Sequence, residues 1–350
     1  MTLADRLLAR IARPGTTVDF TGARCLRRRF IRSGCDLCAR ACRPQAIYPG
    51  EGEVRLESGR CTGCLVCTAV CPTEALTGRD SRLAKAGPKI ATGDGEVVLC
   101  CEKSLRHGTE IILPCLGALS RDHLAAYALL RGRLTLLLYP CRECHSPWVP
   151  DVLQEQLDEL HQQWQGLDHQ PVIHLHLEAK PPAPAHPDPV SDQRRNTDQE
   201  RAPGRRDFFR AFKEVSFHAA AETWTTLREE EQQEEQWAAS KHLPGRLRLL
   251  QQAGERNADH TPLLTALLVE LTVGPECTFC GACIGLCPSG AISGDDDLQR
   301  LDFIPLSCSA CGLCREFCPA RAISIKPLSP GGAADAGEKR LLRERAAAQE

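Results

Sequence analysis

The feature that most constrains this chain is a cysteine-rich motif that occurs four times. The 350 residues include 21 cysteines, and sixteen of these are assigned to the motif: fifteen lie within the four copies, and Cys25 precedes the first copy. The copies span residues 35 to 47, 61 to 76, 277 to 292 and 308 to 323, and the last three follow the pattern C-x2-C-x2-C-x3-C-P. Such self-similarity indicates a repeated structural unit. Each unit is expected to be small and built around its sulfur atoms.

The spacing of the last three copies is that of bacterial ferredoxins, in which three close thiolates bind one 4Fe-4S cluster and the fourth thiolate binds the neighbouring cluster. The copies come in two pairs, and 18 or 20 residues separate the members of a pair. Residues 46–57 and 291–303 within these intervals read as strand, turn and strand. If the last cysteine of each copy binds the cluster of its partner copy, the sequence predicts four ligand sets. They are Cys42, Cys61, Cys64 and Cys67; Cys25, Cys35, Cys38 and Cys71; Cys277, Cys280, Cys283 and Cys318; and Cys287, Cys308, Cys311 and Cys314.

The first copy departs from the pattern, because nine residues separate Cys25 from Cys35 and Arg43 precedes the proline. A cluster with three ligands, open to exchange or to conversion into 3Fe-4S, is therefore an alternative at this position. The insert between the two cysteines is also basic. It is interpreted either as a solvated loop or as a docking surface for an acidic redox partner.

Zinc is the alternative metal, since C-x2-C pairs bind zinc tetrahedrally. Four runs of four cysteines at these spacings favour iron-sulfur clusters instead. Residues 1–15 lack the apolar core of a signal peptide, and no apolar segment reaches the roughly 20 residues of a membrane span. We therefore expect a cytoplasmic protein, where cysteines bind metal rather than form disulfides. A net charge of −2 gives no reason to expect a nucleic-acid partner.

Between the two motif pairs the sequence alternates between strands and helices. Short apolar runs suited to buried strands occur at residues 96–101, 110–115, 133–141 and 171–178, and helical segments are expected at 119–132 and 150–164. This alternation predicts a small parallel sheet. The predicted fold class is therefore a multidomain α+β and α/β protein: two dicluster ferredoxin-like units around a small parallel α/β sheet, plus a helical segment.

The five remaining cysteines follow the ends of these predicted strands: Cys100, Cys101, Cys115, Cys141 and Cys144. Carboxyl ends of parallel strands line one edge of a sheet, where ligand sites are built. Thiolates gathered there need a soft metal, so a fifth metal site is predicted, with His145 as an additional ligand or hydrogen-bond donor. Two alternatives are that the cysteines are small core residues and that the last pair is a redox dithiol.

The order of these segments resembles the methyl-viologen-reducing hydrogenase delta subunit family. The resemblance covers about 80 residues and rests on a first strand with cysteine, a second ending in Cys115-Leu-Gly, a helix, and a third strand ending in Cys141-Arg-Glu-Cys144-His145. It implies a small α/β domain that binds one further cluster, usually 2Fe-2S, and passes electrons to a flavin-containing oxidoreductase. The adjacent Cys100 and Cys101 and the polar segment after Cys141 depart from the family pattern, so the resemblance leaves the cluster type open.

The predicted organisation has six parts. They are a dicluster ferredoxin-like domain at 1–90, a cysteine-rich α/β domain at 91–180, a disordered linker at 181–206, a helical segment at 207–270, a second dicluster domain at 271–330 and a tail at 331–350. The helical segment is expected to pack beside the second ferredoxin unit. The tail is expected to form a loose helix.

The predicted function is that of an iron-sulfur electron-transfer subunit. The sequence contains no glycine-rich phosphate loop, nucleotide fingerprint or Ser/His/Asp set, so the flavin, molybdopterin or hydrogen-activating site is assigned to a partner subunit. Single electrons would pass through four 4Fe-4S clusters and a fifth centre. Two alternatives are a reductase with a catalytic cluster in the middle domain, where a fifth cysteine acts as nucleophile or exchangeable ligand, and a redox sensor with a labile cluster at Cys25.

Overall fold

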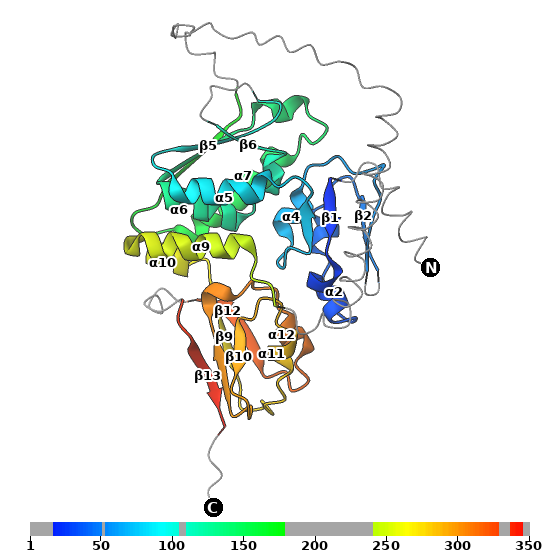
Figure 1. Cartoon of the computed structure of the whole chain (residues 1–350), viewed down its shortest axis with the longest axis vertical. Helices are drawn as coiled ribbons and strands as arrows, with labels where there is room; N and C mark the ends of the chain where they lie inside the picture. The colour runs from blue at the N-terminus through cyan, green and yellow to red at the C-terminus, as the bar shows by residue number, and fades with distance from the viewer. Residues whose placement is uncertain (1–16, 51–52, 105–109, 179–240, 329–336, 346–350) are drawn as a thin grey trace, which may run out of the picture. The chain divides into compact units, whose positions relative to one another are not determined.

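The computed structural model describes residues 17–50, 53–104, 110–178, 241–328 and 337–345 (Figure 1). The linker at 181–206, most of the helical segment before residue 241, and much of the tail lie outside the described residues. Within the described ranges, no helix is both long enough and apolar enough to cross a bilayer. The described chain is a mixed α/β protein with two ferredoxin-like regions and a parallel sheet between them.

The first ferredoxin-like region consists of two short antiparallel strand pairs and the cysteine loops between them. Strand β1 pairs with β4, and β2 pairs with β3, so the hairpin predicted at 46–57 is confirmed. The elements are β1 (Val18–Phe20), η1 (Gly22–Arg24), α2 (Leu26–Arg29), α3 (Leu37–Arg40), β2 (Ile47–Pro49), β3 (Val54–Leu56), α4 (Val66–Val70) and β4 (Leu76–Gly78).

The second ferredoxin-like region repeats this plan with one added strand. Strand β9 pairs with β12, and β10, β11 and β13 form an antiparallel sheet, which confirms the hairpin predicted at 291–303. The elements are β9 (Val269–Val273), α11 (Ala282–Leu286), β10 (Ile292–Gly294), β11 (Arg300–Phe303), η5 (Pro305–Ser307), α12 (Leu313–Phe317), β12 (Ile323–Pro327) and β13 (Arg340–Glu344).

Two local predictions for this region are wrong. The tail was expected to be helical, but residues 340–344 form β13 beside β11, where Leu341 is opposite Asp302. The helical segment predicted to end at residue 270 also runs slightly too far, because strand β9 begins at Val269 and pairs with β12. In both cases an unpaired neighbouring strand offers backbone hydrogen bonds that an isolated helix would have to supply from its own turns.

The sheet between the two regions has four parallel strands in the order β6-β5-β7-β8, as the alternating pattern predicts. Its strands are β5 (Val97–Cys101), β6 (Ile111–Leu113), β7 (Arg133–Leu137) and β8 (Val172–His176). The connecting helical elements are η2 (Leu116–Ala118), α6 (Arg121–Arg131), η3 (Tyr139–Glu143) and α7 (Val149–Trp164). Helix α5 (Arg82–Thr92) leads into the sheet from the first ferredoxin-like region.

The hydrophobic core at this sheet includes helices that precede residues 179–240 in the sequence and helices that follow them. Helix α9 (Gly245–Arg256) packs against α6 and α5, followed by η4 (Ala258–His260) and α10 (Thr261–Thr265). The fully buried Trp164 of α7 donates a hydrogen bond from Nε1 to the carbonyl oxygen of Leu263, at 2.9 Å. The helical segment was expected beside the second ferredoxin unit. Helix α9 does contact η5 there, but its apolar face is buried mainly on α6.

The insert after Cys25 joins the two ferredoxin-like regions. Phe30 packs edge-on against Phe317 of α12, with ring centroids 5.0 Å apart. The carboxylate of Glu316 accepts hydrogen bonds from the hydroxyl of Ser33 at 3.1 Å and from the backbone N–H of Gly34 at 2.7 Å. Neither interpretation of the basic insert predicted this contact.

Candidate metal centres

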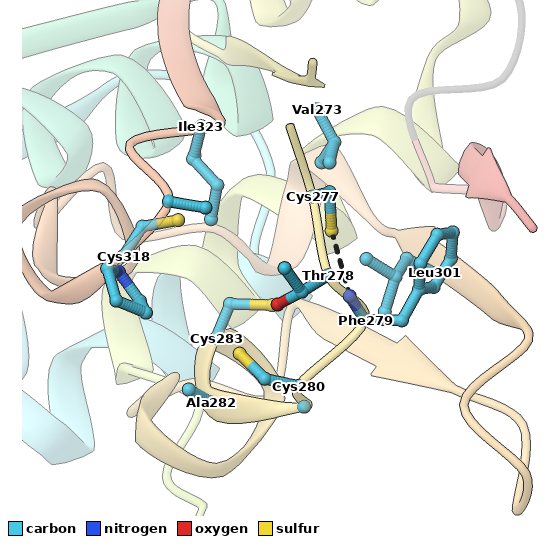
Figure 2. A pocket seen from close by; sticks show the side chains of 13 residues that line it. Val273, Cys277, Thr278, Phe279, Cys280, Ala282, Cys283, Leu301, Cys318 and Ile323 are labelled. Atoms are coloured by element: carbon cyan, nitrogen blue, oxygen red, sulfur yellow. Dashed lines mark hydrogen bonds between the residues drawn. The ribbon is translucent and has the colours of Figure 1, made fainter. Parts of the chain in front are cut away.

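The first thiol set of the second region surrounds one pocket. Cys277, Cys280 and Cys283 come from the loop before and within α11, and Cys318 reaches the pocket from the end of α12 (Figure 2). Apolar side chains, including Ile323, complete the lining. Burial raises the pKa of the Cys283 thiol to about 11, and the neighbouring thiolates add to this effect.

The second thiol set of this region lies around α12. Burial raises the pKa of Cys308 to about 12, with a further contribution from the thiolates of Cys311 and Cys287. The pKa of Cys314 is also raised, first by burial and then by the thiolates of Cys311, Cys308 and Cys287. Cys287 therefore lies with the cysteines of the other motif copy, as the crossed pattern predicts. Its role as a ligand stays a prediction.

The first region brings together its two sets in the same way. Cys42 joins Cys61, Cys64 and Cys67 around a pocket that Leu65 also lines. The second set gathers around a separate apolar pocket, whose lining includes Cys25, Cys35, Cys38 and Cys71. Each set thus contains one cysteine from the opposite motif copy.

Cys25 reaches its pocket despite the long insert. The nine intervening residues contain the helical turn α2, which starts directly after Cys25 and takes up the additional chain length. Cys25 is only 8% exposed. Arg27 donates hydrogen bonds to the carbonyl oxygens of Cys35, at 3.1 Å, and Gly50, at 2.8 Å, so the basic insert supports the loop from within. A structural use of arginine inside this loop is not visible in the sequence pattern.

All four motif copies share a sharp turn after their last cysteine. The residue three positions later has a positive φ of 50° to 75° in every copy: Gln45, Glu74, Gly290 and Arg321. Side-chain-bearing residues rarely adopt this conformation. In the first region the turn directs the next backbone N–H toward the cysteine: Ala46 and Ala75 donate to the sulfur atoms of Cys42 and Cys71, each at 3.2 Å. Such hydrogen bonds stabilise a thiolate and adjust the reduction potential of a bound cluster.

At the carboxyl edge of the parallel sheet, four of the five remaining thiols come together. Burial raises the pKa of Cys115 to about 12, and the thiolates of Cys64, Cys141 and Cys101 act in the same direction. Burial likewise raises the pKa of Cys141 to about 11, with contributions from Cys101 and Cys144. The convergence predicted from the strand ends therefore holds for Cys101, Cys115, Cys141 and Cys144, which we call the sheet-edge set.

Cys100 and His145 do not join the sheet-edge set. Cys100 precedes Cys101 in strand β5 and is fully buried, and successive strand residues point to opposite faces of a sheet. His145 is exposed and forms no hydrogen bond with a described residue. Sequence reasoning also missed Lys103, whose Nζ lies 3.6 Å from the sulfur of Cys144. A cation two residues after Cys101 was the available signal.

The donor chemistry of these sets fits iron-sulfur clusters. Four thiolates gathered side by side repel one another unless a group of positive charge lies between them, and the irons of an iron-sulfur cluster supply that charge. Within the described ranges, no group of three or more His, Cys, Asp or Glu side chains is arranged to hold a single metal ion. In three of the sets, the four thiols line a shared pocket.

Comparison with known families agrees with this chemistry in the two ferredoxin-like regions. Residues 32–75 and 272–319 each match a family model described as a 4Fe-4S dicluster domain. No curated protein and no solved structure matches the chain. Two dicluster domains imply four 4Fe-4S clusters and iron-sulfur electron transfer. The matches include neither Cys25 nor the parallel sheet.

Proposed function

We propose that this chain is an electron-transfer subunit of a multi-subunit oxidoreductase, with a cluster at each of its five thiol sets. The observation that carries this proposal is that successive thiol sets adjoin one another. Bound clusters would supply one-electron redox couples, while the chain holds them close together and excludes water. The twenty ligands we propose are the sixteen motif cysteines, including Cys25, and the four cysteines of the sheet-edge set.

Support for a fifth centre in the relay comes from contacts between the sheet edge and the first ferredoxin-like region. Cys115 lies near enough to Cys64 for the thiolates to interact. The hydroxyl of Ser146 donates a hydrogen bond to Thr62 Oγ1, at 2.8 Å. A cluster in the sheet-edge set would therefore have the Cys42, Cys61, Cys64 and Cys67 cluster as its neighbour.

Support for electron passage between the two ferredoxin-like regions comes from Arg29. This residue is 3% exposed, and its Nε donates a hydrogen bond to the carbonyl oxygen of Ala23 at 3.1 Å. Burial lowers the pKa of its guanidinium, and the thiolates of Cys287 and Cys311 oppose that effect, so both lie nearby. The backbone N–H of Arg29 donates to the carbonyl oxygen of Cys25 at 3.0 Å, while its guanidinium lies near Cys287 and Cys311, so the thiol sets of the two regions come close together at this residue.

The finer features of the proposal rest on the family resemblance and on chemistry. A 2Fe-2S cluster in the sheet-edge set is what the resemblance to the hydrogenase delta subunit family implies. One-electron centres need an electron source and an acceptor, so we propose a redox partner subunit that carries a flavin, a molybdopterin or a hydrogen-activating site.

The structure weakens the case for the two alternative functions, a reductase with a catalytic middle cluster and a redox sensor. A catalytic middle cluster was suggested by a fifth thiol beside it, but Cys100 lies on the opposite face of the strand from Cys101. A sensor with a labile cluster was suggested by an incomplete ligand set, but Cys25 lines the pocket with Cys35, Cys38 and Cys71. Neither alternative is therefore preferred.

The test of this function is the iron and acid-labile sulfide content of anaerobically purified protein. We expect about 18 irons per chain with a 2Fe-2S fifth cluster, or about 20 with a 4Fe-4S cluster. Cys101→Ala should remove the irons of the fifth cluster and its electron paramagnetic resonance signal. Cys100→Ala, the matched control in the same strand, should retain all of the iron.

Three outcomes would contradict the proposal at different points. Iron near 16 in the wild-type protein would remove the fifth centre. Equal iron loss in both variants would mean that the loss reflects damage to strand β5 rather than loss of a ligand. A protein with stoichiometric zinc and little iron would overturn the relay as a whole.

Removing the charge of Arg29 should lower the reduction potential of the cluster at Cys287, Cys308, Cys311 and Cys314. A nearby positive charge stabilises the reduced cluster, which is one unit more negative than the oxidised cluster. For a buried charge we expect Arg29→Leu to lower this potential by on the order of 100 mV. A redox titration followed by electron paramagnetic resonance measures the change.

Two matched variants make this prediction specific. Arg29→Lys keeps the charge and should restore most of the potential. Arg32→Leu removes an exposed arginine of the same insert, whose charge is screened by solvent, and should change the potential little. Equal shifts for Arg29→Leu and Arg32→Leu would show that Arg29 has no special electrostatic role.

A further inference from the structure

A cavity of about 550 Å³ lies between strand β4 and helices α5 and α9. Its volume is in the range of small-molecule binding sites. The walls are mostly apolar and include Leu65, Leu76, Leu83 and Leu249. None of the thiol sets lies in its lining, so the cavity is separate from the proposed clusters.

The cavity shares a wall with each thiol set of the first ferredoxin-like region. Leu65 lines both this cavity and the pocket of Cys42, Cys61, Cys64 and Cys67. Leu76 lines both this cavity and the pocket of Cys25 and its partners. A molecule bound here would be separated from each thiol pocket by a single layer of side chains.

His123 supplies a hydrogen-bond donor to this cavity. The side chain is 91% buried, and its Nδ1 accepts hydrogen bonds from the backbone N–H of Ser120 at 3.3 Å and from the Ser120 hydroxyl at 2.9 Å. Burial, followed by the charge of Arg246, lowers the pKa of His123 to about 4, so the ring is neutral at pH 7. The single ring proton must then be on Nε2, since Nδ1 is an acceptor.

No described residue accepts a hydrogen bond from Nε2 of His123, although the residue lines the cavity. Nε2 is not among the fully buried atoms that lack a partner, so this nitrogen is open to a molecule in the cavity. A ligand with a carbonyl oxygen at this position would accept a hydrogen bond from it. The ring therefore defines one end of a binding site that combines apolar walls with a single donor.

The charged residues of the lining are the carboxylates of Glu74 and Asp80, which pair with His242 and Arg82, and three arginines. Arg79 pairs with Asp19 at 2.8 Å, and Arg246 pairs with Asp122 at 3.0 Å. Arg248 also lines the cavity but forms no ion pair with a described residue. Because Arg248 is exposed, it marks the side of the cavity that is open to solvent.

We propose that this cavity binds a flat organic ring compound of the flavin or quinone class, with His123 donating a hydrogen bond from Nε2 to a ring carbonyl and Arg248 contacting an anionic substituent. Both classes offer a planar apolar ring with carbonyl oxygens. The proposal goes beyond the electron relay, because binding does not depend on whether electrons pass to the ring.

The test measures binding by equilibrium dialysis with the full-length, cluster-loaded protein under anaerobic conditions. The probes are flavin mononucleotide and anthraquinone-2-sulfonate, with menadione as a quinone without an anionic group. We expect at least one anionic probe to bind, and binding of flavin mononucleotide alone or anthraquinone-2-sulfonate alone would identify the class. Absence of binding by all three probes to iron-replete protein would overturn the proposal.

Variants of the cavity identify the contacts. His123→Gln can still accept from Ser120 at the start of α6 but lacks the ring N–H, and should weaken binding of every probe about tenfold. Arg248→Ala should weaken the anionic probes about threefold to tenfold and leave menadione unchanged. Arg256→Ala, a control on the same helix outside the cavity lining, should change no affinity.

Leu249→Trp keeps the test decisive if His123→Gln does not fold. The larger side chain should fill the cavity and abolish binding in a protein that retains its iron and its circular dichroism spectrum. Unchanged affinity in folded Leu249→Trp would place the binding elsewhere and overturn the proposal. Iron content is measured separately, so failure of the relay and failure of this site are distinguished.

Discussion

Replacing Arg246 with alanine is expected to destabilise the protein by about 3 to 5 kcal/mol, the cost of breaking a buried ion pair from one side. Arg246 is 5% exposed, and its Nε donates to Asp122 at 3.0 Å. Its two terminal nitrogens donate to the carbonyl oxygens of Cys71, at 2.9 Å, and Pro72, at 2.8 Å. The Arg246 side chain of α9 therefore links α6 to the turn that follows Cys71, a proposed cluster ligand.

The expected loss comes chiefly from Asp122. The guanidinium of Arg246 holds the pKa of this buried carboxyl below its ordinary value against the opposing effect of burial. Without Arg246 the carboxylate loses its main compensating charge, and two backbone carbonyl groups lose their donors. The fall in Tm should be about 5 to 10 °C in anaerobic scans at one heating rate.

The matched control is Arg248→Ala, two residues along the same helix, because Arg248 is exposed and forms no ion pair with a described residue. Its Tm should change by less than about 2 °C. An Arg246→Ala variant with the same small change would show that the link between α9 and α6 contributes little to stability.

Adding one methyl group at Gly117 is expected to disrupt the junction between the sheet edge and the first ferredoxin-like region. A Cβ atom on Gly117 would lie next to the carbonyl oxygen of Cys64 and within 3.1 Å of Val66. The carbonyl oxygen belongs to the backbone of a cysteine loop and cannot rotate away. Gly117→Ala should therefore cost about 3 kcal/mol and release iron from the clusters that we propose on both sides of the junction.

The matched control is Gly285→Ala in helix α11. A Cβ atom there meets nothing within 4 Å, and alanine favours a helix more than glycine does. Stability and iron content should be unchanged or slightly higher. The measurements are Tm and iron per chain for both variants. A Gly117→Ala protein with full iron and wild-type Tm would mean that the cysteine loop and η2 separate at little cost.

The features that sequence predicted well depend on short stretches of chain. The spacing within each motif predicted which cysteines lie together, and apolar runs predicted the four strands of the parallel sheet. The thiols of Cys101, Cys115 and Cys141 also converge as expected, because parallel strands end at a common edge. In each case a local sequence pattern and a general rule of fold topology are enough to place the residues.

The features that sequence did not predict depend on contacts between distant parts of the chain. Arg246 hydrogen-bonds to residues about 175 positions earlier, and nothing near residue 246 indicates that contact. Strand β13 forms because β11 presents an unpaired edge to it. Cys100 is separate from the sheet-edge set because successive residues of a strand point to opposite faces of the sheet. The prediction of five converging cysteines did not take this alternation into account.

The packing of α9 on α6 has a consequence for the order of biosynthesis. The ribosome completes the first ferredoxin-like region and the parallel sheet long before it reaches residue 245, yet the apolar face of α6 is covered by α9. Until α9 emerges, the nascent chain exposes that face and lacks the donor that Arg246 gives to the carbonyl of Cys71. Stable insertion of the first pair of clusters is therefore expected to wait until translation has passed α9.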